Sequence, residues 1–313
     1  MIQVENLTKQ FDDFTAVDNL SFTVKPGEVL GFLGPNGAGK STTMKMITGF
    51  IEPSAGNVSI FGQSVSEQPL LAQQQMGYLP EGAPAYGEMT VIAFLNFIAD
   101  VRGLKNEQKQ VRLDTVIEQV QLASVLNKTI DTLSKGFARR VGLAQAIIHN
   151  PQILILDEPT DGLDPNQKHQ VRELIKGLAQ DKIVIISTHI LEEVSAVCTR
   201  ALIINQGRLL LDGKPDELEQ QSRHHNAICL QLANDETQVE SSLQALQAID
   251  TVEALGDRTY MIFPVEGKMI LPEIVRFLDN KNWEAENLHL EKGRLEDVFR
   301  HVTKQAPVSE QGK

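Results

Sequence analysis

The sequence predicts an α/β fold whose central sheet is largely parallel. Three short apolar runs predict strands buried on both faces, because such strands show no alternation of polar and apolar residues. These runs are Val29–Leu33, Ile153–Leu156 and Ile183–Ser187. Helical patterns separate them, as expected where crossover helices join parallel strands. Alternating apolar residues near the N-terminus predict an additional antiparallel part. They are Ile2, Val4, Leu20, Phe22 and Val24.

A glycine-rich segment follows the first buried run and opens a predicted helix, Lys40–Thr48, with Gly49 as its C-terminal stop. The segment fits the pattern G-x-x-x-x-G-K-[ST] of a phosphate-binding loop. Its residues are Gly34, Pro35, Asn36, Gly37, Ala38, Gly39, Lys40, Ser41 and Thr42. Glycines let backbone N–H groups close around phosphate oxygens, and the helix N-terminus favours their negative charge.

This loop predicts that the chain binds a nucleoside triphosphate. The Lys40 ammonium is expected to reach the β- and γ-phosphates, and the Ser41 hydroxyl is expected to bind Mg²⁺. The alternative is a glycine-rich turn that fits the pattern by chance. The strand before the loop and the helix after it favour the phosphate site.

The second buried run ends in two carboxylates, Asp157 and Glu158. Asp157 suits a role in holding Mg²⁺ at a phosphate loop. Glu158 is then placed to polarise an attacking water as a general base. A solvated strand end is the alternative, and the phosphate loop upstream favours the catalytic interpretation.

Three further features have both a functional and an ordinary interpretation. Ser134 precedes a helix predicted over Ala138–His149; it can present free N–H groups to an anion or act only as an N-cap. Asp161–Pro165 can be a functional loop or a simple turn. His189 follows the third buried run and can be a site residue or a surface histidine.

Composition limits the possible roles. The chain has 313 residues, and its 29 basic against 41 acidic residues give a net charge of −12 without a basic stripe. We therefore expect no nucleic-acid partner. The two cysteines, Cys198 and Cys229, form no C-x-x-C motif and are expected to be buried, reduced thiols. The N-terminus does not resemble a signal peptide, and no run approaches ~18 apolar residues, so any membrane role is expected to depend on a partner.

Two regions depart from the α/β pattern. Residues 86–135 contain helix-spaced apolar positions over 89–101 and 111–126, which predicts an inserted helical subdomain. Residues 221–313 predict a second, small α+β domain with the element order βαββαβ, as in ferredoxin-like folds. Its last residues, 305–313, are expected to form a frayed tail.

Together these motifs resemble the nucleotide-binding subunit of ATP-binding-cassette (ABC) transporters. The resemblance covers residues 1–220, with the motifs in family order: phosphate loop, signature, Walker B strand, D-loop and switch histidine. It implies a P-loop NTPase fold with a mixed sheet core. The sequence from Gly136 to Pro165 is similar to that of subunits of the ABC-2 exporter class, of the gliding-motility and multidrug type. The C-terminal segment Leu295–Phe299 also resembles a module common in that class.

The resemblance also implies roles for individual residues. Phe11 would stack on adenine, although a plain core aromatic remains the alternative. Ser134 and Gly136 would contact the γ-phosphate held by a second subunit. Asp164 would act across the dimer interface, and His189 would donate a hydrogen bond to the γ-phosphate.

Two motifs depart from the family pattern, the signature and the Q-loop. Lys135 and Phe137 stand where the usual Leu-Ser-Gly-Gly-Gln signature has a glycine and the glutamine. Glu81 stands where the family has the Q-loop glutamine; its carboxylate can bind Mg²⁺ directly or through water, but cannot donate a hydrogen bond.

The function implied by the resemblance is ATP hydrolysis that powers an ABC-2 type membrane exporter. We expect MgATP as cofactor, a head-to-tail homodimer that closes on ATP, an ABC-2 permease partner, and a location at the cytoplasmic face of the cell membrane. The alternatives are a non-transport ABC ATPase and a regulatory module in which residues 221–313 sense a ligand. The interval from Ser41 to Leu133 holds a helical subdomain but not a long coiled coil, which disfavours the chromosome-type ATPases.

Overall fold

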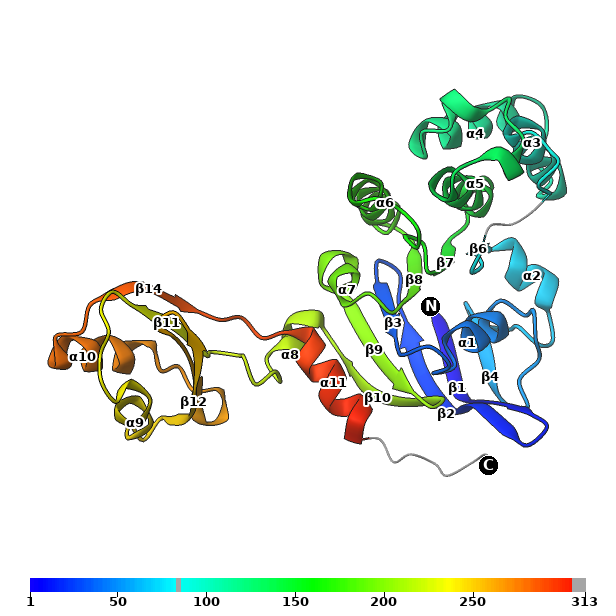
Figure 1. The fold of residues 1–313 in the computed structure, drawn as a ribbon. Helices are drawn as coiled ribbons and strands as arrows, with labels where there is room; N and C mark the ends of the chain where they lie inside the picture. The colour runs from blue at the N-terminus through cyan, green and yellow to red at the C-terminus, as the bar shows by residue number, and fades with distance from the viewer. Residues whose placement is uncertain (83–85, 306–313) are drawn as a thin grey trace. The chain divides into compact units, whose positions relative to one another are not determined.

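The computed structural model describes residues 1–82 and 86–305, and the expected tail therefore lies almost wholly outside the described residues. The chain forms two compact units, Met1–Gly213 (unit 1) and Lys214–Lys313 (unit 2), each described here by itself (Figure 1). The division falls before residue 220 because helix α8 (Pro215–Glu219) packs against α11 (Leu295–Gln305) within unit 2.

Unit 1 contains a six-stranded sheet in the order β10-β9-β3-β8-β7-β6. Its strands are β3 (Val29–Leu33), β6 (Met76–Leu79), β7 (Ile153–Asp157), β8 (Ile183–Thr188), β9 (Arg200–Asn205) and β10 (Arg208–Gly213). All neighbours pair in parallel except β10, which runs antiparallel to β9. Each of the three buried runs predicted from the sequence forms a central strand of this sheet.

A second sheet of unit 1 is antiparallel and has the order β2-β1-β4-β5. Its strands are β1 (Ile2–Phe11), β2 (Phe14–Val24), β4 (Ala55–Ile60) and β5 (Gln63–Ser64). Strands β1 and β2 form a hairpin in which Phe11 pairs with Phe14. The apolar residues that alternate along both strands face one core, which confirms the predicted antiparallel part.

Seven α-helices of unit 1 lie in its described residues. They are α1 (Lys40–Ile47), α2 (Pro69–Gln74), α3 (Val91–Val101), α4 (Asn106–Gln119), α5 (Lys135–Ile147), α6 (Pro165–Leu178) and α7 (Leu191–Val197), with 3₁₀ turns η1 (Ala123–Val125) and η2 (Ile130–Thr132). Helix α5 begins at Lys135, earlier than the predicted Ala138, because Ser134 caps it directly. The helix predicted over 111–126 instead starts at Asn106 and ends before Gln121, whose φ is +55°.

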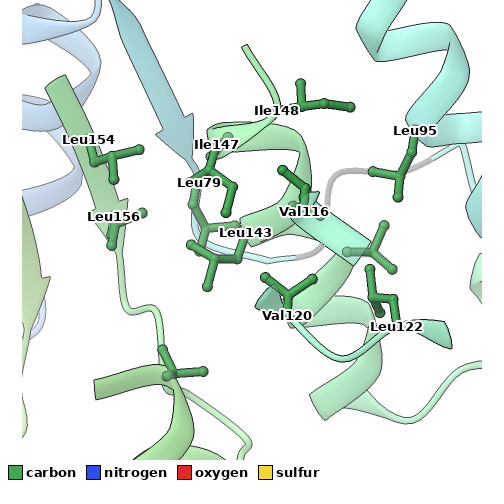
Figure 2. Close-up of a cluster of buried hydrophobic side chains, with 14 of the residues drawn as sticks. Leu79, Leu95, Val116, Val120, Leu122, Leu143, Ile147, Ile148, Leu154 and Leu156 are labelled. Atoms are coloured by element: carbon green, nitrogen blue, oxygen red, sulfur yellow. The ribbon is translucent and has the colours of Figure 1, made fainter. Parts of the chain in front are cut away.

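The two faces of the parallel sheet contact different hydrophobic cores. Along β7, Ile153 and Ile155 face a core shared with α1 and the antiparallel sheet. Leu154 and Leu156 face a second core built by the helical region (Figure 2). Because both faces are buried, Ile153–Leu156 are all apolar, which explains the continuous run in the sequence.

The second core ties the helical insertion to the sheet. Figure 2 shows α5 side chains, including Leu143 and Ile147, beside Leu154 and Leu156 of β7. Residues of α3 and α4 belong to the same core. Helix α5 also packs directly on β6. The helical insertion and the strand that carries Asp157 therefore share one core.

Unit 2 contains an antiparallel sheet in the order β12-β13-β11-β14. Its elements are β11 (Ile228–Leu232), α9 (Val239–Gln244), β12 (Ile249–Gly256), β13 (Thr259–Pro264), η3 (Val265–Gly267), α10 (Leu271–Lys281) and β14 (Ala285–Leu290). The order β11-α9-β12-β13-α10-β14 is a split βαβ arrangement of the ferredoxin-like type. Helix α9 ends at Gln244, before β12 begins at Ile249.

None of the described helices has the length and apolar character needed to cross a bilayer. Both cysteines are free thiols. Burial raises the pKa of the Cys198 thiol to about 12, so it stays protonated and unreactive at neutral pH.

Unit 1 contains a histidine that should make its stability depend on pH. The His149 Nε2 lies 3.0 Å from the Met76 carbonyl oxygen, and burial, aided by the charge of Arg102, lowers the His149 pKa to about 4 from 6.5. Below about pH 6.5 the unfolded chain takes up this proton while the folded chain does not. Between pH 7 and 4.5 we expect His149 to lower the free energy of unfolding by about 2–3 kcal/mol.

Chemical denaturation at both pH values measures this effect. His149→Gln should remove that part of the pH dependence, whereas His169→Gln, at an exposed position of α6, should leave it unchanged. An equal loss of stability on acidification in wild type and His149→Gln would refute the prediction.

Candidate active site

The phosphate loop joins β3 to α1, and its backbone needs glycine at two close approaches. A Cβ at Gly34 would lie 2.7 Å from the Ile204 carbonyl oxygen, and one at Gly39 would lie 2.5 Å from the Ala16 carbonyl oxygen. Gly39 also has a φ of +100°. These contacts hold the loop against β9 and β2, so that the N-terminus of α1 opens onto the site.

The side chain of Lys40 folds back into the phosphate loop. Its side chain is buried, and Nζ donates to the Gly34 carbonyl oxygen at 2.8 Å and to the Pro35 carbonyl oxygen at 3.2 Å. Burial lowers the Lys40 pKa, while the nearby carboxylates, chiefly Glu158, oppose that shift. The loop carbonyls thus hold the Lys40 ammonium at a position where phosphate oxygens can take over its hydrogen bonds.

A cavity of about 360 Å³ lies at the loop. Its lining consists of Phe14, Ala16, Asn36, Gly37, Gly39, Lys40, Ser41, Thr42, Glu81 and Glu158. The loop and two of the predicted acidic residues therefore meet in one place. Gly34, Pro35 and Ala38 contribute loop backbone without lining the cavity.

The aromatic residue at this cavity is Phe14, and Phe11 is not part of its lining. Phe14 is 60% exposed, whereas Phe11 lies under the Lys9 ammonium at 5.1 Å. Phe14 was not predicted from the sequence, because both residues flank the same hairpin turn and only Phe11 was assigned to adenine. Phe11 and Phe14 are direct partners in the pairing of β1 with β2, and Phe14 belongs to β2, the strand that Gly39 of the loop packs against.

Asp157 ends β7 and is almost completely buried. Its Oδ1 accepts a hydrogen bond from Ser187 Oγ, while its Oδ2 is buried without a hydrogen-bond partner among the described residues. A buried carboxylate oxygen without a partner is costly unless a ligand satisfies it. This atom fits a magnesium ion or one of its waters.

No group of three or more His, Cys, Asp or Glu side chains that could hold a metal occurs in residues 1–82 and 86–305. At phosphate sites Mg²⁺ is held by a few protein ligands together with water and phosphate oxygens. The residues available for this are Ser41, Asp157 and Glu81.

Glu158 follows β7 and lines the loop cavity. Its Oε1 lies 2.9 Å from Nδ1 of His189, which comes directly after β8. The Glu158 backbone has a φ of +51°, a left-handed conformation that non-glycine residues seldom adopt. Parallel pairing of β7 with β8 brings the two residues together although they are far apart in the sequence.

The remaining predicted residues lie away from the loop cavity of the same chain. Ser134 caps α5 and accepts from the Phe137 N–H, and Asp164 caps α6 and accepts from the Gln167 N–H at 2.9 Å. Gly136 lies against Gln167: a Cβ there would be 2.4 Å from its Oε1. None of Ser134, Gly136 and Asp164 lines the cavity.

Arg139, a buried arginine of α5, was also not predicted from the sequence. Its guanidinium donates to the main-chain carbonyls of Asp157 and Glu158 and to those of Pro80 and Gly82. The only sequence signal for this role was the position of the arginine, one helical turn after Gly136. That signal is weak, because an arginine at a helix surface usually faces solvent.

A phosphate loop on β3, an acidic end of β7 and a histidine after β8 define an ATPase domain of the phosphate-loop type. A family model described as "ABC transporter" matches residues 17–161. The chain belongs to the ABC transporter family, as an ATP-binding subunit with an ATPase domain, since it covers more than two thirds of relatives at least 30% identical to it.

Among its relatives is the probable multidrug ABC transporter ATP-binding protein YbhF of Escherichia coli, 37% identical over 223 residues, 71% of this chain and 38% of YbhF. The chain thus spans about four tenths of that relative. The Nod factor export ATP-binding protein I of Burkholderia pseudomallei is 38% identical over 215 residues, 68% of this chain and 71% of the relative. A solved "ATP binding subunit of ABC transporter" superposes with a TM-score of 0.66 at 31% identity, covering 71% of this chain and 92% of that one.

Proposed function

We propose that this chain hydrolyses MgATP to power an ABC-2 type exporter. The observation that carries the proposal is the division of the site. Lys40 and Glu158 line one cavity, whereas Ser134 and Gly136, the signature residues, lie outside it. Such a half-site requires a second copy to supply the signature, and closing and opening of that dimer is a motion able to drive a membrane partner.

The residues of the cavity have distinct tasks in hydrolysis. Lys40 leaves the Gly34 and Pro35 carbonyls and binds phosphate oxygens, while the loop N–H groups bind the remaining oxygens. Ser41, Asp157 and Glu81 would hold Mg²⁺, which neutralises charge that develops on the phosphates. Glu158 accepts a proton from the attacking water. His189 is held beside Glu158 and would donate to the γ-phosphate.

Each of the two predicted departures from the family has a physical consequence. Phe137 lies near the Arg140 guanidinium, 5.8 Å from ring centroid to Cζ, so it contributes packing in place of an amide. Glu81 lines the loop cavity, where its carboxylate adds a possible magnesium ligand.

The docking site for the membrane partner is proposed to be a groove of about 750 Å³ between α2, β6 and α3. Large apolar side chains on its rim are exposed, notably Leu70 at 74%, Phe50 at 68% and Val101 at 65%. A cluster of this kind is typical of a protein interface. An apolar helix of a permease fits it, which would place the chain at the cytoplasmic face of the membrane.

The groove gives a direct test of the exporter assignment. Leu70→Glu combined with Val101→Glu should lower co-purification with a multi-span membrane protein by about 100-fold, because two apolar anchors become charged. ATP hydrolysis by the double variant, purified without the membrane protein, should persist, since neither residue lines the loop cavity. Quantitative mass spectrometry of the affinity-purified complex measures the loss.

Val111→Glu is the matched control. Val111 is 55% exposed on α4 and does not line the groove. If the double variant still retains the membrane protein at the wild-type level, the proposed docking site is wrong. If the wild-type chain retains no membrane protein at all, the exporter assignment itself is wrong and the alternative of a non-transport ATPase is favoured.

A further inference from the structure

We propose that Arg139 is a positioning residue for ATP hydrolysis, which fixes the backbone of Glu158 and links it to the loop that carries Glu81. The inference rests on the proposed role of Glu158 as general base. It adds a residue that lines no part of the loop cavity and whose hydrogen bonds go to main-chain carbonyls.

The Arg139 guanidinium connects two segments that are distant in the sequence. Nη1 donates to the carbonyl oxygens of Pro80, at 2.9 Å, and Gly82, at 2.8 Å, which flank Glu81. Nη2 donates to the carbonyl oxygens of Asp157 and Glu158. A planar guanidinium can serve four acceptors in two directions at once, which no other side chain can do.

The position of Arg139 also makes its charge effective. It is 6% exposed, and burial lowers its pKa, but the carboxylates of Asp157, Asp161, Glu158 and Glu81 oppose that shift, so the group remains a cation. A buried cation among these carboxylates offsets their mutual repulsion when no nucleotide is bound.

Arg139 acts at a backbone position that needs support. Glu158 has a φ of +51°, and such conformations persist only where surrounding contacts hold them. Its N–H donates to the Ser187 carbonyl oxygen at 3.0 Å, and its carbonyl accepts from Arg139 and from the Asp161 N–H at 3.2 Å. With both peptide groups fixed, the side chain is directed toward His189 and the cavity.

The same guanidinium makes the two segments move together. A displacement of the Glu81 loop must break the bonds to Pro80 and Gly82 or shift Arg139, and a shift of Arg139 acts on the Glu158 carbonyl. Arg139 thereby couples the state of the Glu81 loop to the orientation of the general base.

Arg139→Gln in the full-length chain tests the inference. A misplaced general base slows the chemical step without weakening the phosphate contacts, so we expect kcat to fall by about tenfold to a hundredfold while KM for ATP changes by less than about threefold. Arg139→Lys keeps the charge but cannot reach all four carbonyls, so its kcat should lie between those of wild type and Arg139→Gln.

Arg112→Gln is the matched control. Arg112 is partly buried and, like Arg139, donates to main-chain carbonyls, those of Ile147 and Ile148 at the other end of α5. We expect comparable loss of thermal stability with kcat changed by less than about twofold. Hydrogen exchange of the amides of Glu158 and Asp161 gives a readout besides activity: it should become faster in Arg139→Gln and not in Arg112→Gln.

The outcomes separate this inference from the proposed role of Glu158. If Arg139→Gln retains wild-type kcat and exchange rates, Arg139 is not a positioning residue. If Arg112→Gln loses kcat equally, the effect is one of general stability and the inference is equally wrong. If Arg139→Gln behaves as expected but Glu158→Gln hydrolyses ATP normally, Arg139 positions this backbone but Glu158 is not the base.

Discussion

Glu158→Gln should bind ATP normally and hydrolyse it about 100- to 10,000-fold more slowly than wild type, the range expected when a general base is lost. The amide is nearly the same size as the carboxylate and keeps the contact distance to His189, but it cannot accept a proton from water. Phosphate release at saturating MgATP measures turnover, and equilibrium binding of a labelled ATP analogue measures affinity.

The same variant tests whether two copies share the site. Because ATP persists in it, Glu158→Gln with MgATP should elute from a sizing column as a dimer, and without nucleotide as a monomer. Glu192→Gln is the control, since that carboxylate is 79% exposed and pairs with Arg172. Wild-type turnover in Glu158→Gln would remove the residue from its role, and a persistent monomer with bound ATP would refute the shared site.

Lys40→Ala should abolish measurable nucleotide binding at micromolar concentrations. Lys40 is the buried cation of the loop, and two charge-assisted hydrogen bonds to phosphate are worth about 3 kcal/mol or more, equivalent to a loss of about 100-fold in affinity. Isothermal titration with MgATP measures the change. The fold should persist, because Lys40 donates only to carbonyls of its own loop.

Lys45→Ala provides the matched control on the same helix. Lys45 is exposed on α1 and contributes no side chain to the loop cavity. The Lys45→Ala and Lys40→Ala variants have the same net charge, because each loses one lysine. Equal affinities in the two variants would mean that total charge, and not the position of Lys40 in the loop, governs nucleotide binding.

The phosphate loop and the acidic strand end could be predicted from the sequence because both are local. Gly34–Thr42 needs only its own glycines and the flanking strand and helix, and Asp157 needs only the end of an apolar run. Helix limits were less predictable. Helix α5 begins at Lys135 because the Ser134 side chain caps it, whereas apolar spacing alone favoured Ala138.

Phe14 and Arg139 could not be predicted, because their positions depend on contacts between distant segments. Phe14 lines the loop cavity because its strand, β2, lies against Gly39 of the phosphate loop. Arg139 is buried because four carbonyls of two other segments accept its hydrogen bonds, and an arginine without such acceptors would face solvent.

The sequence by itself determined the fold class and the chemistry of the loop, because strand burial, helix period and backbone approach to phosphate are encoded over a few consecutive residues. Only the tertiary structure decided which side chains share one cavity. It joined Glu158 to His189 through parallel pairing of β7 with β8, and it left Ser134 and Gly136 outside. Distances between segments follow from sheet order and packing, which no single stretch of the chain specifies.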